Sequence, residues 1–304
     1  MIKSVGIIIV NYNSGSLLKA CVDSVFSNKE TTVKLNLVII DNNSHDNSLD
    51  FEMNSQVQVI KNLKNMGFGF ACNQGIAALK DSEYILFLNP DTEIKPKTIN
   101  KSLIFLEDNP EVSILGVCHI DKYDKIKISC SRKPRPLNIL FDIIGFSKIL
   151  PKVFHSATLM YDFDHNSSKF VDQVMGAFML LKRDVCDRLN GFDTRFFLYY
   201  EDADFALRAK EIGYLSYYNS DIKILHHGRG TTEKISHIGL FYNLRSRIQF
   251  VNKHYGKFYA ILIEAITLTL EPVSRLVFNS LSNNWSQNIV TLKAFRLLFK
   301  NIIK

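Results

Sequence analysis

Two short acidic segments contain the residue types best suited to catalysis. Asn-Pro-Asp at residues 89–91 follows the apolar run 84–88, and Glu-Asp-Ala-Asp at residues 201–204 follows the aromatic run 196–200. A carboxylate held by a proline turn after a buried strand is well placed to hold Mg²⁺ or Mn²⁺, which prefer oxygen ligands and bridge substrate phosphates. A second carboxylate could take a proton from a hydroxyl. Beside a nucleotide pocket, this pairing would suit sugar transfer from a nucleoside diphosphate to an alcohol.

Each acidic segment also has a simpler interpretation. Asn-Pro-Asp is an ordinary turn sequence, and Glu-Asp-Ala-Asp could be only the charged first turn of a helix in which Asp204 pairs with Arg208. Against this, the aromatic run at 196–200 provides an apolar setting that would raise a carboxyl pKa toward the range useful for a base. Two adjacent acids can also divide the work, one ionised and one tuned.

Strands and helices alternate over the first hundred residues, which predicts an α/β fold with a mostly parallel sheet and right-handed crossovers. Ligands bind such sheets beyond the carboxyl ends of the strands. Polar clusters lie at these ends, at residues 11–13, 41–44 and 89–91. The expected strands span 5–10, 35–40, 57–60 and 84–88, and the expected helices span 16–26 and 69–79.

The rest of the first 235 residues is expected to complete one catalytic domain. Residues 131–170 are rich in proline and aromatic residues without regular periodicity, which predicts a loop-rich insertion or lid. The remaining expected strands span 113–117, 176–182 and 222–225, and the remaining expected helices span 98–106, 183–189 and 202–212.

Residues 236–304 have a helical and basic character and are expected to form a second region. In its last segment, one helix face is apolar and another is basic, which suits a helix lying on an anionic membrane. Packing of the apolar face on the catalytic domain or on a second subunit is the alternative. The apolar face comprises Ile289, Leu292, Phe295, Phe299 and Ile302, and the basic face comprises Lys293, Arg296, Lys300 and Lys304.

Composition excludes several classes of protein. The 304 residues are 46% apolar and 22% charged, which is typical of a folded globular chain. The five cysteines form no C-x-x-C pair, which favours reduced thiols in a cytosolic protein without a zinc site. The net charge of +7 suits anionic lipid or a diphosphate substrate, whereas nucleic-acid binding is disfavoured because no zinc-finger spacing or RNP-type motif is present.

The sequence predicts neither a signal peptide nor a membrane span. The apolar run near the N-terminus is short and is expected to be the first strand. A spanning helix needs roughly 18 uninterrupted apolar residues. The best segment, 258–270, is interrupted by Glu264 and followed by Glu271 and Pro272.

Two further motifs are ambiguous by themselves. His226 and His227 follow an expected strand and could be structural or could hold a metal. Gly67 and Gly69 resemble the start of a dinucleotide fingerprint, but Cys72 stands where the third glycine should be. A nicotinamide-dependent enzyme is therefore disfavoured.

Taken together, the segments closely resemble the family 2 inverting glycosyltransferases with the GT-A fold, a Rossmann-like sheet with flanking helices. The nearest branch is the rhamnosyltransferase-like enzymes of bacterial surface polysaccharide assembly. The resemblance runs from Val5 to about Thr232, and its motifs occur in the family's order. These are residues 10–13, 41–44, 65–75, 89–91 at the D-x-D position, 176–178, 191–193 and 201–204.

The resemblance implies a role for each site residue. Asp202 would be the catalytic base, with Glu201 beside it. Asp91 and His226 would bind Mg²⁺ or Mn²⁺, with His227 as the rival ligand. The donor would contact Asn11, Tyr12, Asp41, Asn65, Gly67, Asn73, Asn89, Pro90 and Asp91. The acceptor side would include Gly176, Ala177 and Asp204.

The implied reaction moves L-rhamnose from dTDP-rhamnose, or a sugar from another dTDP or UDP donor, to a saccharide hydroxyl. The acceptor would be a lipid-linked intermediate of O-antigen, capsule or cell-wall polysaccharide. The enzyme would be cytoplasmic and peripheral on the inner face of the membrane, and its oligomeric state is left open.

Two rival classes fit less well. A nucleotidyltransferase would usually carry a glycine- and lysine-rich phosphate loop, which is absent between residues 10 and 20. A non-catalytic nucleotide-sugar binding protein would lack the acids, yet Asp41, Asp91 and Asp202 are all present.

Overall fold

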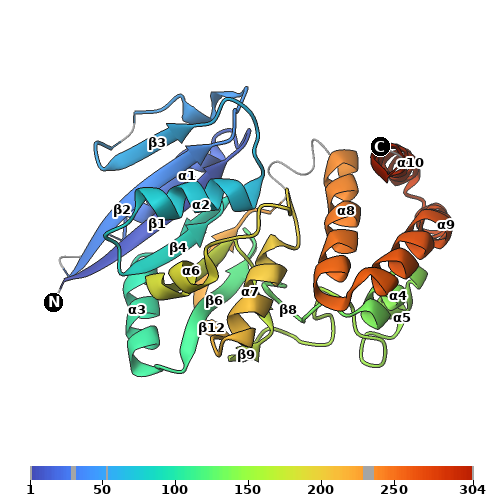
Figure 1. Ribbon diagram of the computed structural model, residues 1–304. Coiled ribbons are helices and arrows are strands. Elements are labelled where there is room, and N and C mark those ends of the chain that lie inside the picture. The colour runs from blue at the N-terminus through green and yellow to red at the C-terminus, as the bar shows by residue number, and fades with distance from the viewer. Residues whose placement is uncertain (1, 29–31, 53, 229–235, 303–304) are drawn as a thin grey trace. The chain divides into compact units, whose positions relative to one another are not determined.

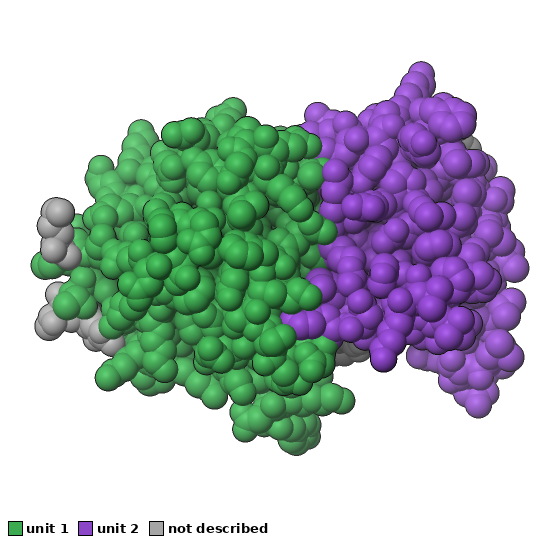
Figure 2. Space-filling view, turned by 90° about the horizontal axis from the view of Figure 1, so that it is seen from below, with its two compact units in different colours: residues 1–131, 164–194, 201–231 green, residues 132–163, 195–200, 232–304 purple. Residues whose placement is uncertain are grey.

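The computed structural model describes residues 2–28, 32–52, 54–228 and 236–302. The chain divides into two compact units, coloured separately in Figure 2. Unit 1 comprises residues 1–131, 164–194 and 201–231, and unit 2 comprises residues 132–163, 195–200 and 232–304. Unit 2 therefore includes two segments that the sequence analysis placed in the catalytic domain.

Unit 1 is built on a mixed sheet, and its described residues contribute ten strands to it (Figure 1). The main order is β3-β2-β1-β4-β11-β6-β12-β5, with β7 beside β6 and β9 beside β12. The first four strands in this order are parallel, and β11 is antiparallel to both of its neighbours. The strands are β1 (Lys3–Asn11), β2 (Val33–Asp41), β3 (Val57–Lys61), β4 (Tyr84–Leu88), β5 (Thr92–Ile94), β6 (Val112–Ile120), β7 (Ile126–Lys127), β9 (Lys169–Val171), β11 (Phe178–Lys182) and β12 (Leu215–His226).

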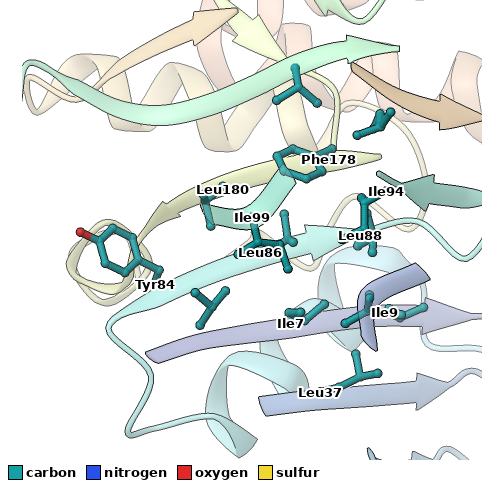
Figure 3. Close-up of a cluster of buried hydrophobic side chains, with 14 of the residues drawn as sticks. Ile7, Ile9, Leu37, Tyr84, Leu86, Leu88, Ile94, Ile99, Phe178 and Leu180 are labelled. Atoms are coloured by element: carbon teal, nitrogen blue, oxygen red, sulfur yellow. The ribbon is translucent and has the colours of Figure 1, made fainter. Parts of the chain in front are cut away.

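Helices cover both faces of this sheet because its central strands are apolar on both sides. Along β1, Ile7 and Ile9 belong to one hydrophobic cluster, while Ile8 belongs to another. Figure 3 shows the first cluster, in which side chains from several strands lie together. Helices α1 (Leu17–Phe26) and α3 (Thr98–Asp108) contribute to the first cluster, and α2 (Phe68–Ala78), α6 (Arg183–Leu189) and α7 (Glu201–Glu211) contribute to the second.

The register of the sheet brings the polar segments together. Asn11 and Asp41 are paired at the ends of the parallel strands β1 and β2. Strand β11 runs back along β4 with Phe178 opposite Leu88, so the residues before Phe178 lie beside the turn after Leu88. The predicted α/β fold, with the polar clusters at the carboxyl edge of a mostly parallel sheet, is confirmed.

Several short elements were not predicted. A separate two-stranded sheet joins β8 (Cys130–Ser131) to β10 (Gln173–Val174), and neither strand is long enough to show a period of two. The strand expected at 222–225 belongs to the longer β12, whose pairing with β6 is irregular between Asn219 and Lys223. That irregularity interrupts the alternation of buried side chains.

Residues 131–170, which were expected to form a loop-rich insertion or lid, also include two short helices. This segment contains α4 (Pro136–Ile144) and α5 (Phe146–Ile149). Pro136 occupies the start of α4, where proline is tolerated because the first helical N–H groups have no intrahelical partner. Gly145, with φ of 84°, separates the two short helices.

Unit 2 consists of helices in the residues that the structure describes. With α4 and α5 they are α8 (Ser236–Tyr255), α9 (Lys257–Leu281) and α10 (Trp285–Ile302). A small core joins Ile139 and Ile143 of α4 to Val251 of α8 and Ile263 of α9. Among the described residues, no helix is both long enough and apolar enough to cross a membrane.

Helix α10 does not pack through the apolar face seen in the sequence. Its buried residues are Thr291, Ala294 and Leu298. Ile289 is 58% exposed, and Leu292 is 57% exposed. Within the described residues, that apolar face is therefore left uncovered.

Candidate active site

Asn11 connects the loops after β1 and β2 through hydrogen bonds of its side chain. Its buried amide nitrogen donates to Asp41 Oδ1 at 2.8 Å and to Ser48 Oγ at 2.8 Å. The other oxygen of Asp41 accepts the backbone N–H of Ser44 at 3.1 Å. Tyr12, next to Asn11, is half-buried. Asn11 and Asp41 thus hold the loop that carries Tyr12 in one conformation.

Asn42 is a structural residue that the sequence analysis missed. It is buried, donates to the carbonyl oxygen of Gly67 at 3.2 Å, and accepts from Asn62 at 2.9 Å. Asn65 in turn accepts the backbone N–H of Gly67 at 2.9 Å, just where α2 begins. These hydrogen bonds connect the end of β2 with the segment around Gly67, which the sequence analysis placed beside the donor. In the sequence, the only indication of a role for Asn42 is that it is a polar residue next to Asp41.

Asn73 contacts the backbone of Phe192. Its side-chain oxygen accepts the N–H of Phe192 at 2.8 Å, and its nitrogen donates to the carbonyl of the same residue at 2.8 Å. This amide therefore positions residues 191–193, which were assigned to the acceptor side. A direct contact of Asn73 with the donor stays a prediction.

Asn89, Pro90 and Asp91 form a turn whose ends are fixed by backbone bonds. The N–H of Asn89 donates to the carbonyl of Ala177 at 3.1 Å, and the N–H of Thr92 closes the turn onto the carbonyl of Asn89 at 3.2 Å. The Asp91 side chain is half-buried. The turn thus presents one carboxylate at the carboxyl edge of β4.

The structure distinguishes the two adjacent histidines. His226 Nε2 lies 3.4 Å from Asp91 Oδ1. His227 Nε2 lies 2.6 Å from Glu93 Oε1. The backbone N–H of His227 donates to the carbonyl of Asp91 at 3.0 Å, but the His227 ring pairs with Glu93. Of the two rings, it is therefore that of His226 that lies beside the Asp91 carboxylate.

Asp91 and His226 fit a divalent cation that keeps open positions. Two ligands about 2.1 Å from one ion, at roughly a right angle, are about 3 Å apart, close to the separation seen here. Across residues 2–28, 32–52, 54–228 and 236–302, no group of three or more His, Cys, Asp or Glu side chains forms a metal cluster. Mg²⁺ commonly takes one or two protein ligands and completes its shell with water and substrate phosphates.

His119 on β6 is a second residue that the sequence analysis missed. It is buried, and its ring meets that of His226 edge-on, with centroids 5.0 Å apart. Burial lowers the pKa of His119 well below its ordinary value, and His226 and His165 lower it further. A neutral ring therefore packs against His226 and restricts its orientation. In the sequence, His119 is one residue of an apolar strand, which gave no signal.

Glu201 and Asp202 begin α7 and have different surroundings. Asp202 accepts the backbone N–H of Ala203 at 2.8 Å and also that of Gly176. Glu201 is 7% exposed, and its Oε2 has no hydrogen-bond partner among the described residues. Burial raises the pKa of both carboxyls, and the charge of Asp202 raises that of Glu201 further.

The pKa of Glu201 is raised well above its ordinary value, further than that of Asp202, so a proton on this pair is favoured on Glu201. Backbone hydrogen bonds from Ala203, Gly176 and Asp202 itself favour the charged form of Asp202. Glu201 has one such bond, from its own N–H, against a larger burial penalty and the neighbouring charge of Asp202. This is the division of work between adjacent acids that the sequence suggested.

Asp204 has a structural partner. It is fully buried, and its Oδ2 accepts from Arg208 Nε at 2.7 Å. The other nitrogens of Arg208 donate to the carbonyls of Leu189 and Gly191. Asp204 thus joins α7 to the end of α6, as the simpler interpretation proposed, and its contact with the acceptor stays a prediction.

Gly176 and Ala177 connect the two acidic segments. The N–H of Gly176 bonds to Asp202, and the carbonyl of Ala177 accepts from Asn89. The carbonyl of Ala177 also accepts from Thr92 Oγ1 at 3.4 Å. Two residues directly before β11 therefore hold Asp202 and the Asn89–Asp91 turn in a fixed relation.

A mostly parallel sheet covered by helices on both faces, with acidic side chains at its carboxyl edge, is the arrangement expected of a glycosyltransferase of the GT-A type. The sequence matches the Glycosyl transferase family 2 model over residues 6–168, more than half of the chain. The chain belongs to this family, which confirms the resemblance seen in the sequence.

Two relatives show which proteins the chain is similar to. The low-salt glycan biosynthesis hexosyltransferase of Haloferax volcanii is 27% identical over 213 residues, 69% of this chain. The chain spans only 62% of that protein's length. The N-acetylglucosaminyl-diphospho-decaprenol L-rhamnosyltransferase of Mycobacterium tuberculosis is 24% identical over 265 residues, 82% of this chain and 85% of that protein.

Among solved structures, a mannosyltransferase from Pyrobaculum calidifontis in complex with GDP-Man and Mn²⁺ has a similar fold. The TM-score is 0.57 at 15% identity, over 99% of this chain and 87% of that one. At this identity the likeness concerns the fold alone.

Replacing Glu201 with glutamine should flatten part of the pH dependence of stability. The raised pKa means that folded Glu201 holds a proton above its ordinary pKa of 4.5, where the unfolded chain has released it. Folding then binds a proton, so this contribution to the free energy of unfolding falls as pH rises above 4.5. Wild type should lose stability relative to Glu201→Gln between weakly acidic and weakly basic pH, as measured by denaturant unfolding.

A matched control is Glu211→Gln, which removes an exposed carboxyl from the same helix. Its stability curve should run parallel to that of wild type. Parallel curves for Glu201→Gln as well would show that Glu201 is ionised normally and that the assignment of the proton is wrong.

Proposed function

We propose that this glycosyltransferase inverts the anomeric centre and moves L-rhamnose from dTDP-rhamnose to a hydroxyl of a lipid-linked saccharide. The observation that carries the proposal is the joint attachment of Asp202 and of the Asn89–Asp91 turn's first residue to Gly176 and Ala177. The name and coverage of the Mycobacterium tuberculosis relative support rhamnose and a diphosphate-linked lipid acceptor.

In the proposed reaction, the acceptor oxygen attacks the anomeric carbon as the bond from that carbon to the diphosphate oxygen breaks. Asp202 takes the hydroxyl proton, and the electron pair of the broken bond leaves with the nucleoside diphosphate. Attack from the face opposite the leaving group inverts the configuration. Glu201 remains protonated and adds no second negative charge beside the base.

Donor binding is assigned to the carboxyl edge of the sheet. Tyr12 would stack on the pyrimidine, and Asp41 with Asn11 would hold the loop that presents it. Asp91 and His226 would hold Mg²⁺ or Mn²⁺, which offsets the charge on a departing diphosphate.

A UDP-hexose donor is the second candidate, favoured by the relative named as a hexosyltransferase. A thermal-shift screen of dTDP, UDP and GDP and their sugars separates the two, because a ligand bound only by the folded state raises the unfolding midpoint. A non-catalytic binding protein would show the shift without releasing sugar from any donor.

Asp202→Asn should reduce transfer by about 10²- to 10⁴-fold, the usual loss on removing a general base. Donor affinity should stay within about twofold, because Asp202 is expected to meet the acceptor and not the nucleotide. Turnover is measured with saturating donor, and affinity by calorimetry. Glu211→Gln on the same helix is the control and should behave as wild type. Near wild-type turnover of Asp202→Asn would exclude it as the base.

His226→Ala and His227→Ala form a matched pair that tests the metal assignment. His226→Ala should weaken Mn²⁺ binding in the presence of dTDP by about tenfold or more, because a side chain that binds the metal directly is lost. His227→Ala should leave it nearly unchanged, because that ring pairs with Glu93. Electron paramagnetic resonance of free Mn²⁺ measures both without requiring activity. The reverse order would identify His227 as the ligand.

We also propose that α10 lies on anionic membranes. Its apolar side chains Ile289, Leu292 and Phe299 are exposed, and so are Lys293, Arg296 and Lys300. Apolar burial with basic flanks suits an interfacial helix. The sequence also placed Lys304 on the basic face, and that residue lies outside the described part of the chain.

Flotation with phosphatidylcholine vesicles, with and without phosphatidylglycerol, tests this. Recruitment should need the anionic lipid and fall with salt, since each lysine or arginine near the surface contributes about 1 kcal/mol. Leu292→Ser with Phe299→Ser should abolish it, whereas Ile104→Ser, an exposed apolar change on α3, should not. Self-association of the intact protein without vesicle binding would instead assign the face to a second copy.

A further inference from the structure

Unit 2 contains a cavity of its own, about 240 Å³ in volume. Its walls come from α4, α8, α9 and the segments after α4. Tyr200, which also lines it, is followed directly in the chain by Glu201 and Asp202. Neither the donor site nor the metal site described above uses this cavity.

The two carboxylates in the cavity wall already have partners. Asp142 accepts from Ser147 Oγ, from Ser156 Oγ at 3.0 Å and from the N–H of Ala157 at 2.8 Å. Glu271 accepts from both Arg247 and Arg275. Neither acid is therefore available as the main acceptor for a neutral polyol.

The cationic side chains of the cavity retain unused donors. Arg275 gives Nε and Nη2 to Glu271, and Nη1 has no partner among the described residues. The Arg275 side chain is 38% exposed. Lys148 is exposed, with Nζ 4.7 Å from the centroid of the Phe278 ring. Together with Arg247 these make three cations against two carboxylates, which favours an anionic ligand that accepts hydrogen bonds.

The two helices that carry these cations also carry exposed apolar side chains. Ile149 is next to Lys148 on α5, and Val277 and Phe278 come two and three residues after Arg275 on α9. Exposed apolar side chains near a charged cavity suit a ligand that is partly apolar. A ligand with an anionic head and an apolar chain would satisfy both features.

The size of the cavity limits what can enter it. At about 30 Å³ per water molecule, it holds roughly eight waters, and sites for drug-sized ligands usually start at about 300 Å³. A whole nucleotide sugar is therefore too large. A diphosphate head group is of suitable size.

We propose that this cavity binds the diphosphate head of a prenyl-type lipid, with Lys148 and Arg275 contacting the phosphate oxygens. The apolar chain would lie over the exposed side chains of α5 and α9. The inference builds on the proposed function, because it gives the lipid-linked acceptor a binding site in unit 2.

Binding of farnesyl diphosphate to the intact protein tests the proposal. Calorimetry is performed with EDTA and excess dTDP, so that a diphosphate site on the metal side is blocked. Lys148→Glu should weaken binding about tenfold or more, because charge-assisted hydrogen bonds are lost and repulsion is added. Lys148→Arg should restore it. Lys257→Glu, the same charge change at an exposed position of α9 that does not line the cavity, should have no effect.

Three outcomes would overturn the proposal. Equal binding of farnesol would show that only the apolar surface is recognised. Equal binding of dihexanoyl phosphatidylglycerol would show a general phospholipid site. Equal binding by Lys148→Glu and wild type, with unchanged unfolding midpoints, would place the diphosphate elsewhere.

Failure here is distinguishable from failure of the proposed function. The thermal shift with dTDP reports on unit 1 and does not involve Lys148. Loss of farnesyl diphosphate binding with an intact dTDP shift would remove only the lipid site. A missing dTDP shift with intact lipid binding would count against the proposed donor alone.

Discussion

The chemistry of unit 1 depends on the backbone of two residues, Gly176 and Ala177. One gives its N–H to Asp202, and the other gives its carbonyl to Asn89. Both stand directly before β11, whose first residue, Phe178, is paired with Leu88 of β4. Moving the Asn89–Asp91 turn would disturb the pairing of β4 with β11 as well as these contacts. The relation between Asp202 and this turn therefore depends on the register of two strands.

The same contacts decide which acid is charged. The start of a helix favours negative charge, and Asp202 additionally has two N–H donors. Glu201 shares the helix end but is buried with an oxygen that has no partner among the described residues. A buried acid without a full set of partners lowers the stability of the fold when it ionises. Such a residue is retained where activity depends on it, at a cost in stability. A protonated Glu201 would leave the pair with a single negative charge, as the proposed role of Asp202 requires.

Strand and helix positions in unit 1 could be predicted because they depend on apolar periodicity, as in β4 and α6, whose bounds were correct. The place of the site followed from the carboxyl ends of parallel strands. Asn42 and His119 could not be found in this way, because each acts through a buried partner distant in sequence. Ala177 acts through its backbone carbonyl, and the type of side chain at a position does not indicate such a contact. Pro136 was taken as a sign of loop structure, but proline is also common at the first position of a helix, where it stands in α4.

The polar and apolar groups of unit 2 point to one kind of ligand. In a chain adapted only to water, exposed apolar side chains would be scattered, and a buried Arg247–Glu271 pair would add little stability by itself. Here Arg247 and Arg275 share the carboxylate of Glu271, so two guanidinium groups face one negative charge and favour a further anion. The apolar side chains beside it would be costly to expose without a partner. A lipid diphosphate resolves both conditions at once, because its head meets the cations while its chain covers the apolar surface.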